Sequence, residues 1–169
     1  LRRLQVLFYG DLKMIAPIKR MTLPENNFPT VWQTVIFRNY GFVDSEKIAK
    51  TLQTDVATID AEAKRLGISK FERIKDFDEN GYITIIRNNW FLLPYDQLCT
   101  LTGFSMEKLE FVLKEEDFLW VKLANFKPQC KPVKYKPLSK TAIKKTEVIA
   151  KTVSKYYENG YGKYFKFFD

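Results

Sequence analysis

The sequence predicts a mainly α-helical fold with a minor β component: two tandem tri-helical, helix-turn-helix-like repeats, a small β-hairpin and a C-terminal helix. Three observations predict it. Apolar residues recur at the three- and four-residue spacing of helices. Glycines or good capping residues mark most of the expected helix ends. A stretch that begins at Arg38 recurs, with changes, from Arg87, and an internal repeat indicates one structural unit used twice.

The two copies align at a shift of 49 residues first and of 50 residues later. Arg38-Asn39 matches Arg87-Asn88, and Phe42 matches Phe91. After one inserted residue, Ile48, Ala49 and Ile59 match Leu98, Cys99 and Leu109. This register divides the chain into an extended N-terminal arm (1–27), a first tri-helical repeat (28–68), a linker (69–81), a second repeat with the hairpin (82–136), and a basic C-terminal helix with an aromatic tail (137–169).

The first repeat has clear start signals for three helices. Pro29-Thr30 can open a helix, since proline fits the first turn. Asp44 or Ser45 can cap the second helix, and a tight turn at Gln53-Thr54 separates it from a third that starts at Asp55. This order is that of the helix-turn-helix unit.

In the second repeat, the residues from Tyr82 to Asn88 are β-branched enough to favour a strand. They align with the first helix of the first copy, so the repeat predicts a helix instead. Further helices are expected from Pro94 to Leu101 and from Ser105 onward.

The segments Phe118–Leu123 and Cys130–Tyr135, which flank residues 124–129, predict a β-hairpin placed where a winged helix carries its wing. Ser139 can then cap a long helix that reaches Glu158. At the other end of the chain, Leu4–Tyr9 is apolar enough for a short strand.

Composition removes several classes of site. The chain of 169 residues has no histidine, which excludes Ser-His and Cys-His catalytic pairs and the commonest zinc ligand sets. Two cysteines cannot form a disulfide framework, and Cys99 is expected to face the core as a buried thiol. No signal-peptide-like or membrane-spanning run occurs, which slightly favours the cytoplasm. We expect no cofactor.

The net charge of +8 belongs to the C-terminal part. Of 28 Lys and Arg residues, 12 lie after residue 120, where the only acidic residues in the sequence are Glu147, Glu158 and Asp169. The third helix of each repeat instead has more acidic than basic residues, which opposes insertion beside a phosphate backbone. The lysines are either a solvated surface or a site for an anionic partner, and the candidates are Lys127, Lys131, Lys134, Lys136, Lys144 and Lys145.

A calcium loop is a weaker candidate. Asp76, Asp78 and Asn80 occupy its first ligand positions, and Thr84 follows. Arg87 stands where a bidentate glutamate should complete the shell, so a capping turn is the favoured interpretation.

Glu115, Glu116 and Asp117 are adjacent and do not predict two carboxyls that face each other across a sugar. Trp32, Trp90 and Trp120 lie in apolar patterns typical of a core.

Three segments carry a family resemblance: IFRNYGFV (36–43), IIRNNWFLLPYDQL (85–98) and above all LKEEDFLWVKLANFKPQCKPVKY (113–135). Over residues 28–169 the chain resembles the N-terminal region of large bacterial glycoside-hydrolase-like proteins. The resemblance implies a further C-terminal domain of the same protein as the main partner, and it places no catalytic residue here.

We therefore expect a non-catalytic helical accessory module of a larger bacterial, carbohydrate-active protein. The alternative is a winged-helix-like nucleic-acid-binding module that uses the basic hairpin and the C-terminal helix. An enzyme that acts alone is the third hypothesis. No membrane partner is expected.

Overall fold

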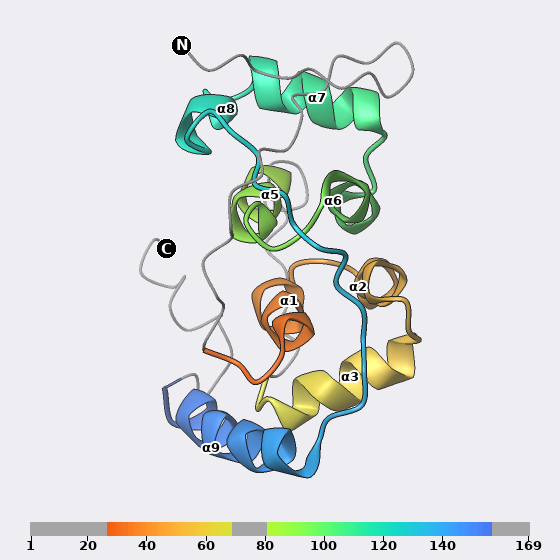
Figure 1. Ribbon diagram of the computed structural model, residues 1–169, viewed down its shortest axis with the longest axis vertical. Helices are drawn as coiled ribbons and strands as arrows, with labels where there is room; N and C mark the ends of the chain where they lie inside the picture. The colour runs from red at the N-terminus through yellow and green to blue at the C-terminus, as the bar shows by residue number, and fades with distance from the viewer. Residues whose placement is uncertain (1–26, 69–80, 157–169) are drawn as a thin grey trace, which may run out of the picture.

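The computed structural model describes residues 27–68 and 81–156, and within these ranges the chain is mainly helical (Figure 1). The helices are α1 (Val31–Asn39), α2 (Ser45–Leu52), α3 (Val56–Arg65), α5 (Tyr82–Asn89), α6 (Tyr95–Thr102), α7 (Met106–Glu115), α8 (Leu119–Lys122) and α9 (Lys140–Tyr156). The described residues form no β-strand. The predictions for residues 1–26, 69–80 and 157–169, including the N-terminal strand, fall outside the described residues.

The starts of the predicted helices are confirmed by capping hydrogen bonds. The Asp55 carboxylate accepts from the Thr58 N–H at 2.8 Å, which holds the pKa of that carboxyl below its usual value. Ser105 and Ser139 cap α7 and α9 in the same way, each at 3.2 Å. Asp44 precedes α2, but its side chain makes no capping hydrogen bond.

The ends of α3 and α6 are also where the sequence predicts them. Gly67 and Gly103 follow these helices with φ of 76° and 77°, in the left-handed region that favours glycine. Gly67 has a second role, because a Cβ at this position would lie 3.0 Å from the carbonyl oxygen of Ala150. The absent side chain therefore lets α9 approach the end of α3 closely.

The β-branched segment before Asn89 is helical, as the repeat predicts. It forms α5, which buries Ile86 and Asn89 completely against its neighbours. The contacts of α5 are with α1 and α6. Tertiary packing on one helix face therefore outweighs the local strand preference of the segment.

Two buried asparagines join α1 to α5. The Asn39 side-chain amide donates to Asn89 Oδ1 at 2.9 Å, and the Asn89 amide donates back to Asn39 Oδ1 at 2.8 Å. Each amide also donates to the carbonyl four residues earlier in its own helix, at 2.7 Å to Val35 and 2.8 Å to Ile85. Both side chains are fully buried, and these four bonds use both N–H donors of each amide.

The backbone at the two asparagines corrects the predicted register. The Asn39 carbonyl accepts the N–H groups of Phe42 and Val43, and the Asn89 carbonyl accepts those of Leu92 and Leu93. The same hydrogen-bond pattern therefore recurs at a spacing of 50 residues, whereas the predicted match of Arg38-Asn39 with Arg87-Asn88 has a spacing of 49. No inserted residue is needed, because Ile48 and Leu98 follow at the same shift.

The helices form two halves that pack against each other. Helices α5 to α8 lie in one half, in the upper part of Figure 1, and α1, α2 and α3 lie in the other half below them. Helix α2 lies against α6, and α1 lies against α5. The apolar core is continuous across this contact, with Ile36, Leu52, Ile86 and Leu98 all fully buried.

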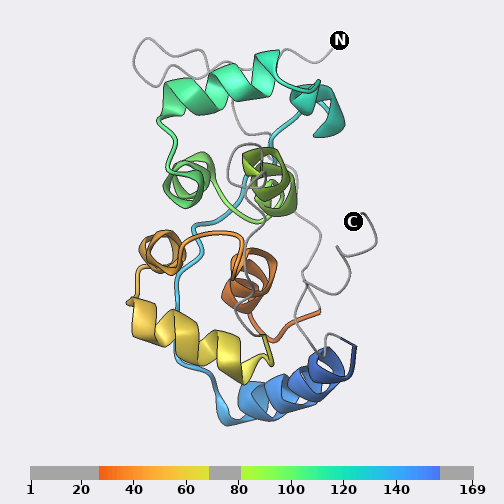
Figure 2. The same ribbon diagram turned by 180° about the vertical axis from the view of Figure 1, so that it is seen from behind.

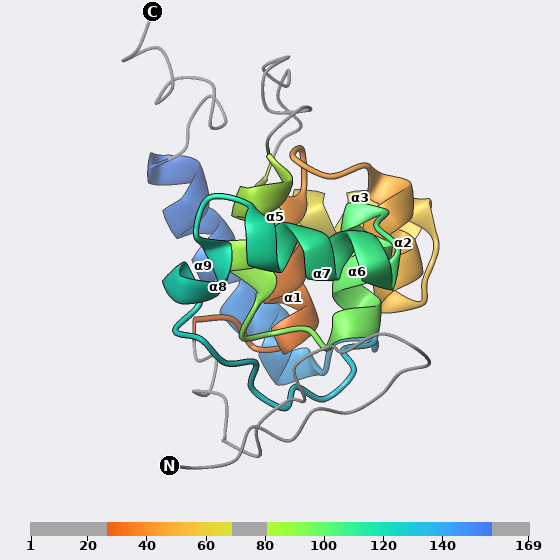
Figure 3. The same cartoon turned by 90° about the horizontal axis from the view of Figure 1, so that it is seen from above.

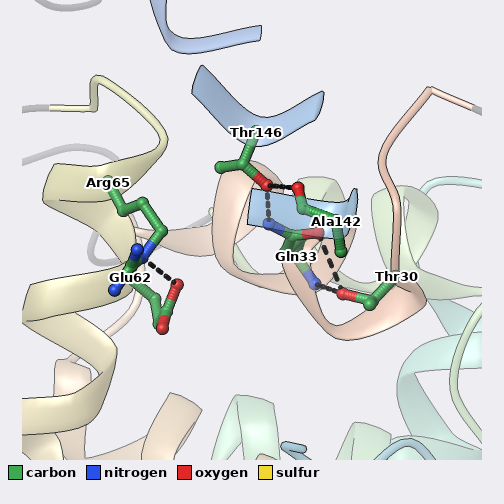
Figure 4. A network of polar contacts seen from close by, with 6 residues as sticks. All are labelled: Thr30, Gln33, Glu62, Arg65, Ala142 and Thr146. Carbon is green, nitrogen blue, oxygen red and sulfur yellow. Dashed lines mark hydrogen bonds and ion pairs between the residues drawn. The ribbon is translucent and has the colours of Figure 1, made fainter. Parts of the chain in front are cut away.

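The C-terminal helix α9 is anchored on the first half. The Gln33 side-chain amide of α1 donates to Thr146 Oγ1 at 2.8 Å, and the Thr146 hydroxyl donates to the carbonyl of Ala142 (Figure 4). Gln33 and Thr146 are both fully buried. Seen from above, α9 and α2 lie on opposite sides of α1 (Figure 3). These contacts fix which face of α9 points to solvent.

The predicted hairpin was wrong. Its first arm contains helix α8, because Leu119 and Leu123 are both buried and lie four residues apart, which is a helical spacing. Strand alternation would also have buried Val121, which is 60% exposed. Before α8, Asp117 and Phe118 have positive φ angles of 51° and 50°, which separate it from α7.

The second predicted arm runs extended past both halves without a strand partner (Figure 2). Its backbone bonds to helices instead. The Gln97 side chain of α6 accepts from the Val133 N–H at 2.8 Å and donates to the Val133 carbonyl at 2.7 Å. The Tyr135 N–H donates to the Leu52 carbonyl at the end of α2. These bonds satisfy the groups that a hairpin would have paired.

Substitution of Asn39 by alanine is expected to lower the free energy of unfolding by about 1–3 kcal/mol, because the buried Asn89 amide loses its partner. Urea unfolding followed by circular dichroism measures it. In the Asn39→Ala/Asn89→Ala double variant the loss should be smaller than the sum of the two single losses.

Asn88→Ala is the matched control, since Asn88 is exposed and would be the partner of Asn39 in the register of 49. Its stability should change by less than about 0.5 kcal/mol. Additive losses at Asn39 and Asn89 would refute the coupling.

Candidate functional site

The outward face of α9 carries a stripe of lysines. Lys140, Lys144, Lys151 and Lys155 are exposed and follow one another at intervals of four, seven and four residues. These intervals place them on one side of a helix. Glu147 and Val148 interrupt the stripe, and Val148 is 65% exposed. We call these four lysines the α9 stripe.

A second group of lysines lies on the extended segment before α9. Val133 and Tyr135 point inward, while Lys134 and Lys136 are exposed, which is the alternation of an extended chain. Lys131 is exposed as well. Of the predicted anion-binding residues, Lys131, Lys134, Lys136, Lys144 and Lys145 are therefore at the surface.

Lys127 is the exception among the predicted anion-binding residues. Its side chain is fully buried, and its ammonium donates to the carbonyl oxygens of Trp90 and, at 2.6 Å, of Leu93. It also lies over the Trp90 ring, 4.8 Å from the centroid. A surface anion cannot reach this group. Lysine is mostly exposed in proteins, so no local pattern marks this one as internal.

The acidic residues of α3 are turned inward. Asp60 Oδ1 accepts from the Tyr40 hydroxyl at 3.0 Å and from the Ser45 hydroxyl at 3.1 Å. Glu62 is 5% exposed and pairs with Arg65, with 3.1 Å between Nε and Oε2 (Figure 4). The charge count that opposed DNA binding by this helix therefore does not describe its outer surface.

On the other half, the acidic run at the end of α7 is divided among different partners. Glu116 accepts from the Tyr82 hydroxyl and pairs with Lys108, and Asp117 pairs with Lys122 at 2.6 Å. These carboxylates stabilise the connection to α8. Within the described part of the chain, none of these contacts brings two of the carboxylates together across a cleft.

The tryptophans pack in the core, as predicted. Trp32 and Trp90 are buried, and Trp120 packs edge-on against Trp90 with 5.9 Å between the ring centroids. Cys99 is partly buried against the core, and burial, followed by the charges of Asp96 and Glu107, raises the pKa of its thiol to about 11.

The calcium-loop prediction is mostly beyond the described residues. Asp76, Asp78 and Asn80 fall outside them, and Thr84 lies on the exposed face of α5. Residues 27–68 and 81–156 contain no group of three or more side chains suited to hold a metal ion.

A shallow hollow of ≈ 320 Å³ lies where the chain enters α1 beside α9. Phe28, Val148 and Ile149 provide its apolar wall, and Lys145 lies at its edge. No sequence signal indicated it, because its two sides are more than 100 residues apart.

Comparisons with family models, curated proteins and solved structures find no significant match to this chain. Function is therefore argued from the geometry. The helices that the structure describes are too short or too polar to cross a lipid bilayer.

The Tyr40–Asp60 contact gives a pH-dependent prediction. Burial, and then the hydrogen bond and charge of Asp60, raise the pKa of Tyr40 to about 12. The unfolded chain loses this proton near pH 10, so the wild-type free energy of unfolding should fall as the pH rises from about 10 to about 12. Tyr40→Phe should cost about 1 kcal/mol at neutral pH. This cost should shrink over that alkaline range, measured by urea unfolding at each pH.

Ser45→Ala is the matched control, because it removes the other donor to the same Asp60 oxygen without a titrating group. Its loss of stability should be constant over the alkaline range. A Tyr40→Phe cost that stays constant or grows with pH would contradict the assignment.

Proposed function

We propose that this region is a non-catalytic helical interaction module of a larger bacterial, carbohydrate-active protein. The observation that carries the proposal is α9, whose inner face is fixed by the buried Gln33–Thr146 bond while its outer face exposes the α9 stripe and Val148. A rigidly held helix with an open, charged face is suited to contact another surface. The carbohydrate-active context rests on the resemblance of residues 36–43, 85–98 and 113–135.

We also propose that the two halves are copies of one tri-helical unit. The constant shift of 50 residues supports this, since it relates the paired asparagines and the helices that follow them. The contacts of α1 with α5 and of α2 with α6 then join like elements of the two copies. Such a block is a scaffold on which α9 is displayed.

The ionisable side chains inside the block have structural partners. Asp60 and Glu62 hold α3, Glu116 and Asp117 hold the α7–α8 connection, and Lys127 bonds to carbonyls at the end of α5. Carboxylates with these roles are poor acids or bases, because any substrate would have to displace their partners. This supports a module that binds, with a further domain of the same protein as the proposed partner.

The second candidate is nucleic-acid binding through the α9 stripe and the lysines of the extended segment. One observation favours it: within the described residues no carboxylate pairs with Lys144 or Lys151, so both ammonium groups are available to phosphates. In the winged-helix-like hypothesis the hairpin would contact the nucleic acid. In this candidate the extended segment from Lys131 to Lys136 takes that role.

Titration with duplex DNA at two salt concentrations tests the two candidates. If α9 is a phosphate-binding face, Lys144→Glu/Lys151→Glu should lose more than tenfold in affinity and lower the salt slope by about 2. If it is not, binding is weak and depends on net charge alone.

Lys50→Glu/Lys64→Glu is the matched control, since both lysines are exposed on α2 and α3 and the change in charge is identical. Under the main proposal the two double variants lose the same small affinity. A larger loss in the control would favour the helix-turn-helix face and overturn both candidates.

The non-catalytic proposal has its own test. Incubation of the protein with a panel of aryl glycosides and polysaccharides is expected to release no sugar above the rate of a heat-denatured sample. Hydrolysis that persists through repeated purification would overturn it.

A further inference from the structure

Lys127 and Cys130 form a buried amine–thiol pair beside α5. Lys127 Nζ lies 3.4 Å from Cys130 Sγ, and Pro128 and Gln129 separate the two residues in the sequence. Both groups converge on the Trp90 carbonyl oxygen, which lies 3.9 Å from Cys130 Sγ and accepts a hydrogen bond from Lys127. Two side chains from one short segment therefore meet at a single point.

The amine and the thiol differ in how deeply they are buried. Lys127 is fully buried, and within the described residues no carboxylate contacts its ammonium. Cys130 is only partly buried, and the proposal requires that a small oxidant reach its sulfur. Burial lowers the pKa of Lys127, opposed by Cys130, and so increases the fraction of neutral amine.

We propose that Lys127 and Cys130 are a reversible oxidation site, at which a hydroperoxide links Nζ to Sγ through a sulfenamide bond. This inference is independent of the proposed function. It rests on the contact between the two atoms and on the capacity of cysteine sulfenic acid to condense with a nitrogen nucleophile.

The chemistry proceeds in two balanced steps. First, when the Lys127 amine is neutral, it takes the proton of the Cys130 thiol, and the thiolate attacks hydrogen peroxide. The S–O bond forms, the O–O bond breaks, and the leaving hydroxide takes the proton back as water. Second, the amine lone pair attacks the sulfenic sulfur. The N–S bond forms, the S–O bond breaks, and hydroxide leaves with one amine proton as water.

Overall, one thiol, one amine and one hydrogen peroxide give one sulfenamide and two waters. The thiol and amine together lose two electrons and two hydrogens. Two equivalents of a small thiol reverse the change and become a disulfide. Because capture by Lys127 follows the first oxidation at once, Cys130 is protected from the irreversible sulfinic and sulfonic states.

Mass spectrometry of the whole protein after treatment with one equivalent of hydrogen peroxide tests the proposal. Lys127 and Lys131 each precede proline, which trypsin does not cut, so both reacting residues lie on the peptide Leu123–Lys134. This peptide is expected to become lighter by two hydrogen atoms, with an N–S bond between the two side chains in its fragment spectrum. Dithiothreitol should restore the original mass.

Two variants serve as controls. Cys99→Ser removes the other cysteine, which is also partly buried but lies near Asp96 and Glu107, and should leave the product unchanged. Lys127→Arg keeps the cation without the amine, so its peptide should gain an oxygen and react with dimedone, a sulfenic-acid reagent.

Two results would overturn the proposal. One is a folded wild-type protein whose Cys130 gains oxygen without losing two hydrogens. The other is the same two-hydrogen loss in Lys127→Arg, which would show that a backbone nitrogen captures the sulfur. The wild-type result decides the question alone if the arginine variant does not fold, as judged by circular dichroism.

Discussion

The reciprocal amide pair of Asn39 and Asn89 is the constraint on which the arrangement of the helices depends. Each side chain donates across the interface and back to its own helix, and each backbone carbonyl closes the turn that follows. In a low-dielectric interior, an unpaired amide would be costly, so the network is stable only when both halves supply their member. A slip of one residue between α1 and α5 would break both bonds that join the two asparagine side chains.

The remaining contacts follow from this registration. With α1 held against α5, the helices that follow them meet as α2 and α6, and their buried faces close one core. The chain then returns from α8 along both halves, and Gln97 binds both backbone groups of Val133 as it passes. That path places α9 against the first half, where Gln33 bonds to Thr146 and the lack of a side chain at Gly67 permits close packing. The exposed α9 stripe is thus a consequence of internal packing.

The same return path explains the position of Lys127. The segment after α8 passes the turn that follows α5, where the carbonyls of Trp90 and Leu93 accept hydrogen bonds from Lys127. A long cationic side chain satisfies both, and the aromatic faces of Trp90 and Tyr95 contribute to its stabilisation. Cys130 approaches the same carbonyl of Trp90 three residues later. A structural requirement of a helix end therefore places an amine beside a thiol.

The sequence predicts features that depend on neighbouring residues better than features that depend on partners distant in the chain. Local signals placed the capped helices correctly, because Asp55, Ser105 and Gly67 act on their own neighbours in the chain. The helix α5 required the repeat, since its residues alone favour a strand. The errors involve partners that are distant in sequence. The short run 118–123 suits either a strand or a helix turn until its leucines meet a core. Lys127 is internal because carbonyls more than 30 residues earlier need donors.

The candidate site follows the same rule. The net charge of α3 was countable from the sequence, yet the inward orientation of Asp60 and Glu62 depends on Tyr40, Ser45 and Arg65. A partner meets exposed charges, so the electrostatic argument about binding has to be made on α9 and the extended segment, where the lysines and their exposure coincide.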